Sequence, residues 1–395
     1  MDITPPELLA QHLYTLTISQ ETPSTVYISV YRGPNAQNGI YSFREGQQPQ
    51  FTSLTNNSFG ATTFPLILRD ELYYPDFNCV KKVSLKDASI TLIAGSCETS
   101  GYKDGIASQA LFNGPTALAV DALGRIYVVD KGNFRVRKIE NNQVSTYAGK
   151  WIATDHPTQG LNYSCEAGVC TAGNLYDPID RIDYSLRGEP AGKPIQPFIQ
   201  ANDLSKPGVP AKVLPIVQDG DRGSATFWRP GQLALDSLGN LYVSDQIAFQ
   251  HHIRRISPDG HVTTLVADTN HPDPNHNHDN LYPQALHTLD SLTEQDRIRA
   301  LSVSGTMLFT VSGTKLYVLS KHLYRLDLLA GTWKIAIHQQ ELERHMQIEA
   351  QGDNPPGIRD FASDPQGNLY VLLSKSIGLD SGINKLLKIT FPANE

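Results

Sequence analysis

A short histidine-rich stretch is the part of the sequence best suited to hold a metal ion. His271, His276 and His278 are separated only by aspartate, asparagine and proline residues. Imidazole nitrogens and carboxylate oxygens are zinc ligands, and calcium prefers oxygen. The prolines are equally typical of a solvated surface loop that binds nothing. A divalent metal, Ca²⁺ or Zn²⁺, is therefore one alternative for this loop, with His251 and His252 in a neighbouring predicted loop able to approach it.

The four cysteines form a second chemically reactive set. Cys79 and Cys97 flank a predicted hairpin turn at 86–89, and counting back along both strands places them opposite each other, as a disulfide requires. Cys165 and Cys170 lie close together in an irregular segment and could join its two sides. We expect two disulfides and therefore an extracytoplasmic location, secreted or periplasmic, with reduced thiols as the alternative. The spacing disfavours a four-cysteine zinc site.

Composition excludes several classes of protein. Hydrophobic residues make up 40% of the 395 residues, which excludes intrinsic disorder, and charged residues make up 18%, below the roughly 25% of soluble domains. No apolar run approaches the roughly 18 residues of a membrane span. The net charge of −7 disfavours a nucleic-acid partner. The first residues lack the basic and apolar regions of a signal peptide, so we expect either a cytosolic protein or one numbered after signal removal. No phosphate loop, nucleophile elbow or His-Glu-x-x-His motif occurs.

Internal repetition indicates the architecture. Residues 115–130 and 230–245 share a pattern of two apolar strands joined by an Asp-x-x-Gly turn, and a third copy begins at Phe361. The segments before the first two copies also correspond, because Asp-Gly is followed by Ala-x-Phe in both. A second pair of strand-like runs follows each copy. The pattern predicts units of four short antiparallel strands repeated around a circle, which is a β-propeller.

The segment 115–149 resembles an NHL repeat, through Leu-Ala-Val-Asp-x-x-Gly-x-Ile-Tyr-Val-x-Asp-x-x-Asn-x-Arg-Val. The resemblance is good at 228–266 and partial at 358–390. It implies an all-β, six-bladed β-propeller of four-stranded antiparallel blades, forming a single domain over 1–395. The predicted blades are 13–55, 61–95, 115–149, 228–266, 298–338 and 358–392. Strand A of the fifth blade is either 298–302 or 307–311. The fourth strand of the last blade is either missing or supplied by the N-terminus around 2–4.

Long segments are expected to gather on one face of this propeller. We label the strands of a blade A to D, so that A–B and C–D turns share one face, and B–C and D–A connections share the other. The irregular insertion 150–218 lies between the third and fourth blades, and the histidine-rich loop 268–297 follows the fourth. Both are D–A connections. Long ordered loops are uncommon unless functional, so we expect the second face to be the working surface.

Polar residues near the predicted channel mouth are candidates for ligand binding. They lie at or just before strand A of several blades, where Arg and Trp are frequent anchors of recognition surfaces. Arg359 and Asp360 have an alternative role as an ion pair that holds two blades together. The candidates are Asn113, Trp228, Arg229, Arg299 (if strand A of the fifth blade is the earlier segment), Arg359 and Asp360.

The resemblance implies a non-catalytic scaffold that recognises a protein or peptide partner through the loop-bearing face. We expect a monomer without membrane insertion, and no nucleic-acid partner. The alternative is a hydrolase or lyase, similar to lactonases or the amidating lyase, with a divalent metal in the central channel. The predicted inner positions, such as 116–117 and 231–232, lack the histidine and glutamate ligands that such an enzyme requires. The resemblance also implies a structural role for the residues of the repeat pattern, which are Asp130, Asn133, Arg135, Asp245 and Arg254.

Overall fold

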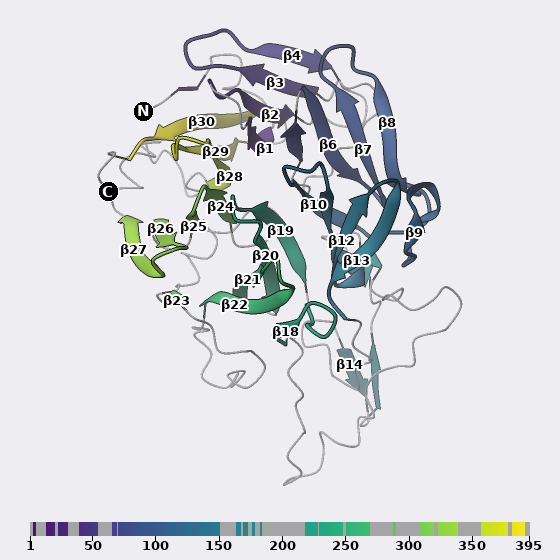
Figure 1. Ribbon diagram of the computed structural model, residues 1–395. Helices are drawn as coiled ribbons and strands as arrows, with labels where there is room; N and C mark the ends of the chain where they lie inside the picture. The colour runs from purple at the N-terminus through teal and green to yellow at the C-terminus, as the bar shows by residue number, and fades with distance from the viewer. Residues whose placement is uncertain are drawn as a thin grey trace.

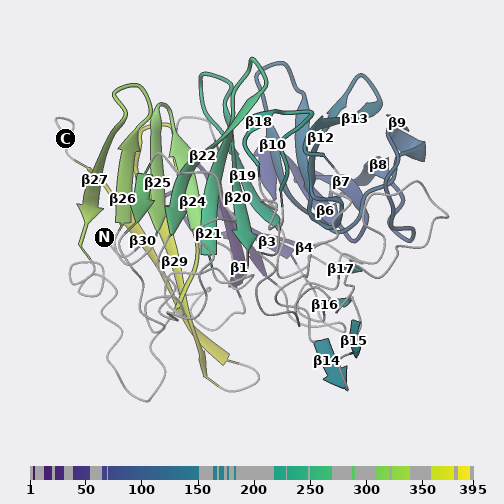
Figure 2. The ribbon, with the colours of Figure 1, turned by 90° about the horizontal axis from the view of Figure 1, so that it is seen from below.

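Six small antiparallel sheets are arranged radially around a common axis (Figures 1 and 2). The computed structural model describes residues 3–4, 13–19, 23–30, 39–53, 65–68, 70–150, 163–166, 169–172, 176–177, 182–183, 218–227, 229–247, 250–268, 287–289, 308–319, 323–338, 357–377 and 381–391, and all structural statements concern these residues. The all-β, six-bladed propeller expected from the repeats is confirmed. None of the described helices is long and apolar enough to cross a membrane.

The first three blades each contain a four-stranded meander. Blade 1 consists of β1 (Leu13–Ile18), β2 (Val26–Val30), β3 (Gly39–Phe43) and β4 (Gln50–Ser53). Blade 2 consists of β5 (Leu66–Leu68), β6 (Glu71–Asp76), β7 (Cys79–Ser84) and β8 (Ile90–Gly95). Blade 3 consists of β10 (Pro115–Val120), β11 (Ile126–Asp130), β12 (Arg135–Glu140) and β13 (Gln143–Ala148), and β9 (Gly105–Ile106) pairs with β13 as a fifth strand.

The last three blades follow the same plan with variations. Blade 4 consists of β19 (Pro230–Leu235), β20 (Leu241–Ile247), β21 (Gln250–Ile256) and β22 (His261–Asp268), and β18 (Gly220–Asp221) and β23 (His287–Leu289) pair with β22. Blade 5 consists of β24 (Leu308–Ser312), β25 (Lys315–Leu319), β26 (Leu323–Asp327) and β27 (Thr332–Ile337). Blade 6 consists of β28 (Gly357–Ser363), β29 (Leu369–Ile377) and β30 (Ser381–Ile389). Strand A of blade 5 is thus the later of the two expected segments.

The hydrophobic core is divided among the blade interfaces. Six clusters of buried side chains each combine residues from two neighbouring blades, including one cluster between blades 6 and 1. The first strands of neighbouring blades contact one another, which makes strand A the innermost strand. Each sheet therefore buries both of its faces, and the ring is one structural unit.

The N-terminus takes part in closing the ring. The backbone N–H of Ile3 donates to the carbonyl of Leu386 in β30 at 2.9 Å, and the N–H of Leu386 donates to Thr4 Oγ1 at 2.7 Å. Because β30 pairs with β29 along its other side, Ile3 and Thr4 lie where the fourth strand of blade 6 would be. Of the two alternatives for this blade, the contacts support the one in which the N-terminus fills the gap.

Three A–B turns are built in the same way. Asp121, Asp236 and Asp364 each accept backbone N–H groups of their own turn. Each also accepts the hydroxyl of a strand-B tyrosine, at 3.2, 2.9 and 3.3 Å respectively. These tyrosines are Tyr127, Tyr242 and Tyr370. The repeated tyrosine therefore both packs between sheets and ties its own turn.

Candidate functional site

The face that carries the B–C and D–A connections has the longest segments between strands. The strands of blades 3 and 4 are separated by the D–A connection from 149 to 229, which includes the hairpin β14 (Tyr163–Glu166) with β15 (Val169–Ala172) and the pair β16 (Tyr176–Asp177) with β17 (Ile182–Asp183). Figure 2 shows β14 and β15 at the same end of the molecule as the β29–β30 hairpin, which is a B–C turn. We call this end the loop-bearing face.

Two of the candidate residues make similar contacts where strand A begins, although the repeat alignment matches Asn113 with Trp228 and Arg229 with Gly114. The backbone N–H of Asn113 donates to Asp130 Oδ1 at 2.8 Å, and the backbone N–H of Arg229 donates to Asp245 Oδ1 at 2.8 Å. Asn113 is buried and Arg229 is half-buried. The aspartate at the end of strand B thus fixes the start of strand A in the same blade. Both residues lie at the loop-bearing end of the inner strands, as the repeat alignment predicts.

A buried arginine clamps the preceding D–A connection onto each of these blades. Arg137 donates to Asp130 Oδ2 at 2.7 Å and to Asp104 Oδ1 at 2.5 Å, and its guanidinium stacks over the ring of Phe112. Arg254 of blade 4 makes the same two contacts, to Asp245 and Asp219. The correspondence of Asp-Gly and Ala-x-Phe seen in the sequence is therefore structural.

The clamp also shows which arginines of strand C correspond in the two blades. Arg254 is equivalent to Arg137, not to Arg135, because each lies two residues further along strand C than the partner of the strand-B aspartate. Arg135 donates instead to the carbonyl of Asn133 and stacks on Tyr102 at 4.1 Å. Burial lowers the pKa of Arg135, so this cation is held in an environment that penalises charge.

The inner strands are joined by polar contacts between neighbouring blades. At five of the six interfaces a side chain near or in strand A hydrogen-bonds to the next blade. The bonds are Thr17 to the carbonyl of Pro65 (3.1 Å), Thr116 to the carbonyl of Gly231 (2.8 Å), Gln232 to the carbonyl of Phe309 (2.8 Å), Ser363 to the carbonyl of Val311 (3.1 Å), and the N–H of Leu16 to Asp360 (2.8 Å). Polar inner residues therefore hold the ring together.

Asp360 is the one carboxylate among these inter-blade contacts. Its side chain is buried, Oδ2 accepts the N–H of Leu16 in blade 1, and Oδ1 accepts the N–H of Phe361 at 2.9 Å. Burial raises the pKa of Asp360 to about 7, and the two backbone N–H groups only partly oppose this effect. Asp360 does connect two blades, but through a backbone amide. Nothing is described of the side chain of Arg359, which lies in β28.

The two adjacent histidines lie in a strand and not in a loop. His251 and His252 belong to β21, because β20 and β21 remain paired as far as Ile247 and Gln250. Both side chains are buried. Burial, reinforced by Arg254 and the neighbouring His251, lowers the pKa of His252 to about 3, so its imidazole is neutral at physiological pH. His271, His276 and His278 lie outside the described residues, and a metal site there stays a prediction.

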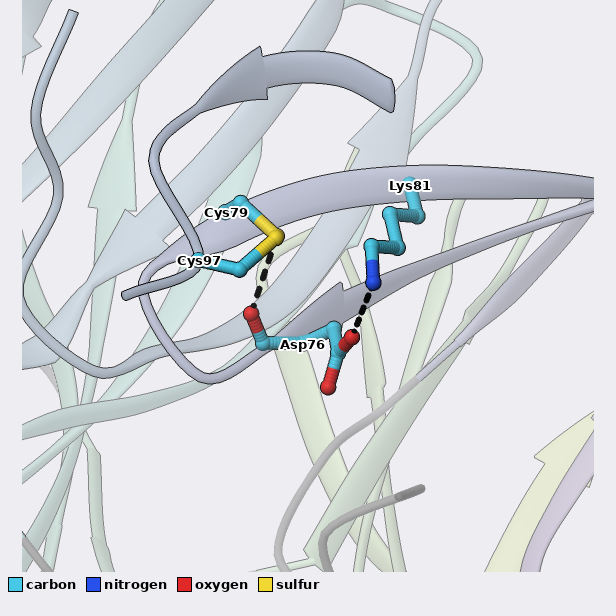
Figure 3. The surroundings of a disulfide bond; sticks show 4 residues. All are labelled: Asp76, Cys79, Lys81 and Cys97. Atoms are coloured by element: carbon cyan, nitrogen blue, oxygen red, sulfur yellow. Dashed lines mark hydrogen bonds and ion pairs between the residues drawn. A yellow bond between two sulfur atoms is a disulfide. The ribbon is translucent and has the colours of Figure 1, made fainter. Parts of the chain in front are cut away.

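The expected disulfide between Cys79 and Cys97 is present, with the Cα atoms 4.6 Å apart (Figure 3). The reasoning from hairpin register was wrong, however, because Cys79 pairs with Gly95. A bulge between Val80 and Lys81 shifts the register, and Cys97 lies two residues beyond the end of β8. The chain can turn back there because Gly95 has φ of 89°.

The second pair of cysteines lies directly across a hairpin. Cys165 in β14 is the register partner of Cys170 in β15. This placement is compatible with the expected second disulfide, which stays a prediction.

The described part of the chain offers one group of three potential metal ligands. Asp76, Cys79 and Cys97 have ligand atoms within 4.8 Å of one another. The group does not fit a metal, since both sulfurs are joined in the disulfide and an Asp76 oxygen accepts from Lys81 at 2.6 Å. It also lies in blade 2 at the B–C turn, not on an inner strand. Among the described residues, no group of three histidine, cysteine, aspartate or glutamate side chains lies on the inner strands.

The structure therefore describes the positions of only some of the residues expected at the channel mouth. Asn113, Arg229 and Asp360 lie on or beside inner strands, whereas Trp228 and Arg299 lie outside the described residues. Arg299 was expected at the mouth only if strand A of blade 5 were the earlier segment, and that strand is Leu308–Ser312. One exposed aromatic on the same face, Phe77, was not singled out from the sequence. Its position in a two-residue turn between predicted strands was the available signal.

Comparison with known proteins is consistent with the repeat analysis. Residues 112–139 match the NHL repeat. No curated protein sequence matches the chain significantly.

Several solved structures are similar in fold. A protein of unknown function from Bacteroides thetaiotaomicron VPI-5482 shares 14% identity and a TM-score of 0.36 over 94% of this chain, which spans 58% of that protein. A catalytically inactive virginiamycin B lyase from Staphylococcus aureus, with quinupristin, shares 12% identity and a TM-score of 0.43, with 98% of both chains covered. A gluconolactonase from Xanthomonas campestris shares 11% identity and a TM-score of 0.38, with 97% and 83% covered. These values are too low to carry an argument about function.

Proposed function

We propose that this chain is a non-catalytic binding scaffold that recognises a protein or peptide segment through its loop-bearing face. The observation that carries the proposal is the use of the inner polar side chains. Thr116, Gln232 and Asp360 lie on inner strands, where an active site in the central channel would draw its groups, and each instead bonds to a neighbouring blade. The inner strands are built to close the ring.

The rigidity of the ring supports the same proposal. The buried guanidinium groups of Arg137 and Arg254 hold the D–A connections against blades 3 and 4 through ion pairs with Asp104 and Asp219, and the N-terminal residues contact the last blade. Segments that are already ordered lose less conformational freedom on binding, which favours affinity. A surface assembled from connections of several blades is therefore suited to an extended partner.

The disulfide supports an extracytoplasmic location for the proposed scaffold. Cys79 and Cys97 are joined, and disulfides persist in secreted and periplasmic proteins but are rare in the cytosol. We propose that the protein acts there as a monomer with a protein or peptide partner.

Selection from a random peptide library displayed on phage tests the proposed function. Peptides that bind the immobilised protein are mapped by hydrogen–deuterium exchange of the complex. We expect slower exchange at 96–101, 112–114 and 131–134, where the D–A connection of blade 3 lies beside its B–C turn on the loop-bearing face. Protection confined to the A–B turns, such as 121–125, or the failure of any peptide to bind, would contradict the proposal.

A further inference from the structure

The B–C turn of blade 2 exposes a large aromatic side chain in an unfavourable backbone conformation. Phe77 has φ of 51°, in the left-handed region that bulky residues rarely adopt, and its side chain is 60% exposed. Phe134 in the B–C turn of blade 3 has nearly the same conformation, with φ of 57°, but is only 7% exposed. Burial of the Phe134 ring offsets the free-energy cost of this backbone conformation. Among the residues that the structure describes, the Phe77 ring has no comparable burial to offset this cost.

The turn that carries Phe77 is fixed on three sides. On one side Lys81 Nζ pairs with Asp76 Oδ2 at 2.6 Å, and on the other the Cys79–Cys97 disulfide ties strand β7 to the following connection (Figure 3). Asn78 Oδ1 accepts the backbone N–H of Gly114 at 3.1 Å, which attaches the turn to the start of blade 3. Phe77 therefore projects from a rigid support, in a turn tied to Gly114, the residue that follows Asn113.

The charges beside the turn are already paired. Lys81 contacts Asp76, and Arg137 of blade 3 contacts two aspartates. Of the two residues in the turn, Phe77 is exposed and Asn78 is only partly exposed, so the main group that the turn presents to solvent is an apolar ring. An aromatic residue on a rigid support is the kind of side chain that contributes most to binding at protein interfaces, because little motion is lost when it enters a partner's pocket.

We propose that Phe77 is the hydrophobic anchor residue through which the loop-bearing face binds its partner. The partner is a protein or peptide segment whose aliphatic or aromatic side chains enclose the Phe77 ring. This inference rests on the proposed function, since it names a contact within the same binding face. Strain and exposure at Phe77 are retained because binding, not folding, uses the ring.

Three variants test the anchor with the phage-selected peptides as probes. Phe77→Gly removes the ring and relieves the positive φ, so we expect a higher thermal midpoint together with at least a tenfold loss of peptide affinity. Phe77→Ala, which keeps the strained conformation, should lose affinity equally without the gain in stability. Leu329→Ala is the matched control, because Leu329 is 70% exposed in a C–D turn on the opposite face. It should leave affinity unchanged.

The outcomes separate the two proposals. Peptides that bind the wild type but bind Phe77→Ala and Phe77→Gly equally well would overturn the anchor and leave the binding scaffold standing. A loss of affinity in Leu329→Ala as large as in Phe77→Ala would also overturn the anchor. If no peptide binds the wild type, both proposals fail together.

Discussion

Replacing Asp360 by asparagine should make the stability of the ring less sensitive to pH. Asp360 joins blade 6 to blade 1 by accepting the N–H of Leu16, and its side chain is only 3% exposed. Burial raises its pKa to about 7 from the ordinary value of 3.8. The folded protein therefore keeps a proton on Asp360 in a pH range where the unfolded chain has released it.

The sign and size of the effect follow from linkage. Between pH 3.8 and about 7 the folded state binds more protons at Asp360 than the unfolded state, so the free energy of unfolding falls as pH rises through this range. At about 1.4 kcal/mol per pKa unit, the loss is on the order of 4 kcal/mol, complete above pH 7. Asparagine carries no charge at any pH but has only one acceptor oxygen, so it can keep only one of the two backbone N–H bonds that Asp360 accepts. Asp360→Asn should therefore be less stable than the wild type by about 1 kcal/mol near pH 4 and the more stable protein at pH 8.

Urea denaturation of both proteins from pH 4 to 8.5, followed by tryptophan fluorescence, measures this difference. Subtracting the two curves removes the contribution of carboxylates with lowered pKa, such as Asp87, whose pKa of about 2 acts in the opposite direction. Thr116→Val is the matched control, because it removes a neutral contact between blades 3 and 4 and should cost about 1 kcal/mol at every pH. A difference between Asp360→Asn and wild type that stays flat with pH, or that favours wild type at pH 8, would refute the reasoning.

Three further substitutions test the contacts that hold the blades. Arg137→Met should lower the free energy of unfolding by about 3–5 kcal/mol, since it leaves Asp130 buried without its cation; guanidinium denaturation checks this, and a loss below about 1 kcal/mol would contradict a tight clamp. Cys79→Ser should cost about 3 kcal/mol by opening the disulfide, and an unchanged denaturation midpoint would count against it. Thr4→Ala should cost about 1 kcal/mol and accelerate amide exchange at Leu386, whereas unaltered exchange would mean that the N-terminus does not close blade 6.

The repeats made the fold predictable from sequence. Strands A and B of blades 3 and 4 were recognisable from the apolar residues on either side of a fixed Asp-x-x-Gly turn, and both signals depend only on neighbouring residues. The correspondence of Asp104 and Asp219 was visible in the same way. The structural role of Asp104 was not visible, because its ion pair with Arg137 joins residues that are distant in sequence. The spacing alone equally allowed Arg135 to be the partner of Asp104.

The candidate site was less predictable because it depends on contacts between distant residues. The pairing of Cys79 with Gly95 depended on a bulge that shifts register by a local backbone change, which residue counting does not detect. Asp360 was identified as an ion-pair candidate, but its partner is a backbone amide of Leu16 at the other end of the chain. Phe77 was passed over because exposure is a property of the assembled surface.

Sequence alone determined the number of blades, their strand order and the face on which the long connections gather, because each follows from a period and from the direction of successive strands. Tertiary structure decided which polar groups are occupied in holding the ring and which side chain is left exposed on a rigid turn. Those outcomes depend on burial and on hydrogen bonds between blades, and both exist only once the circle has closed.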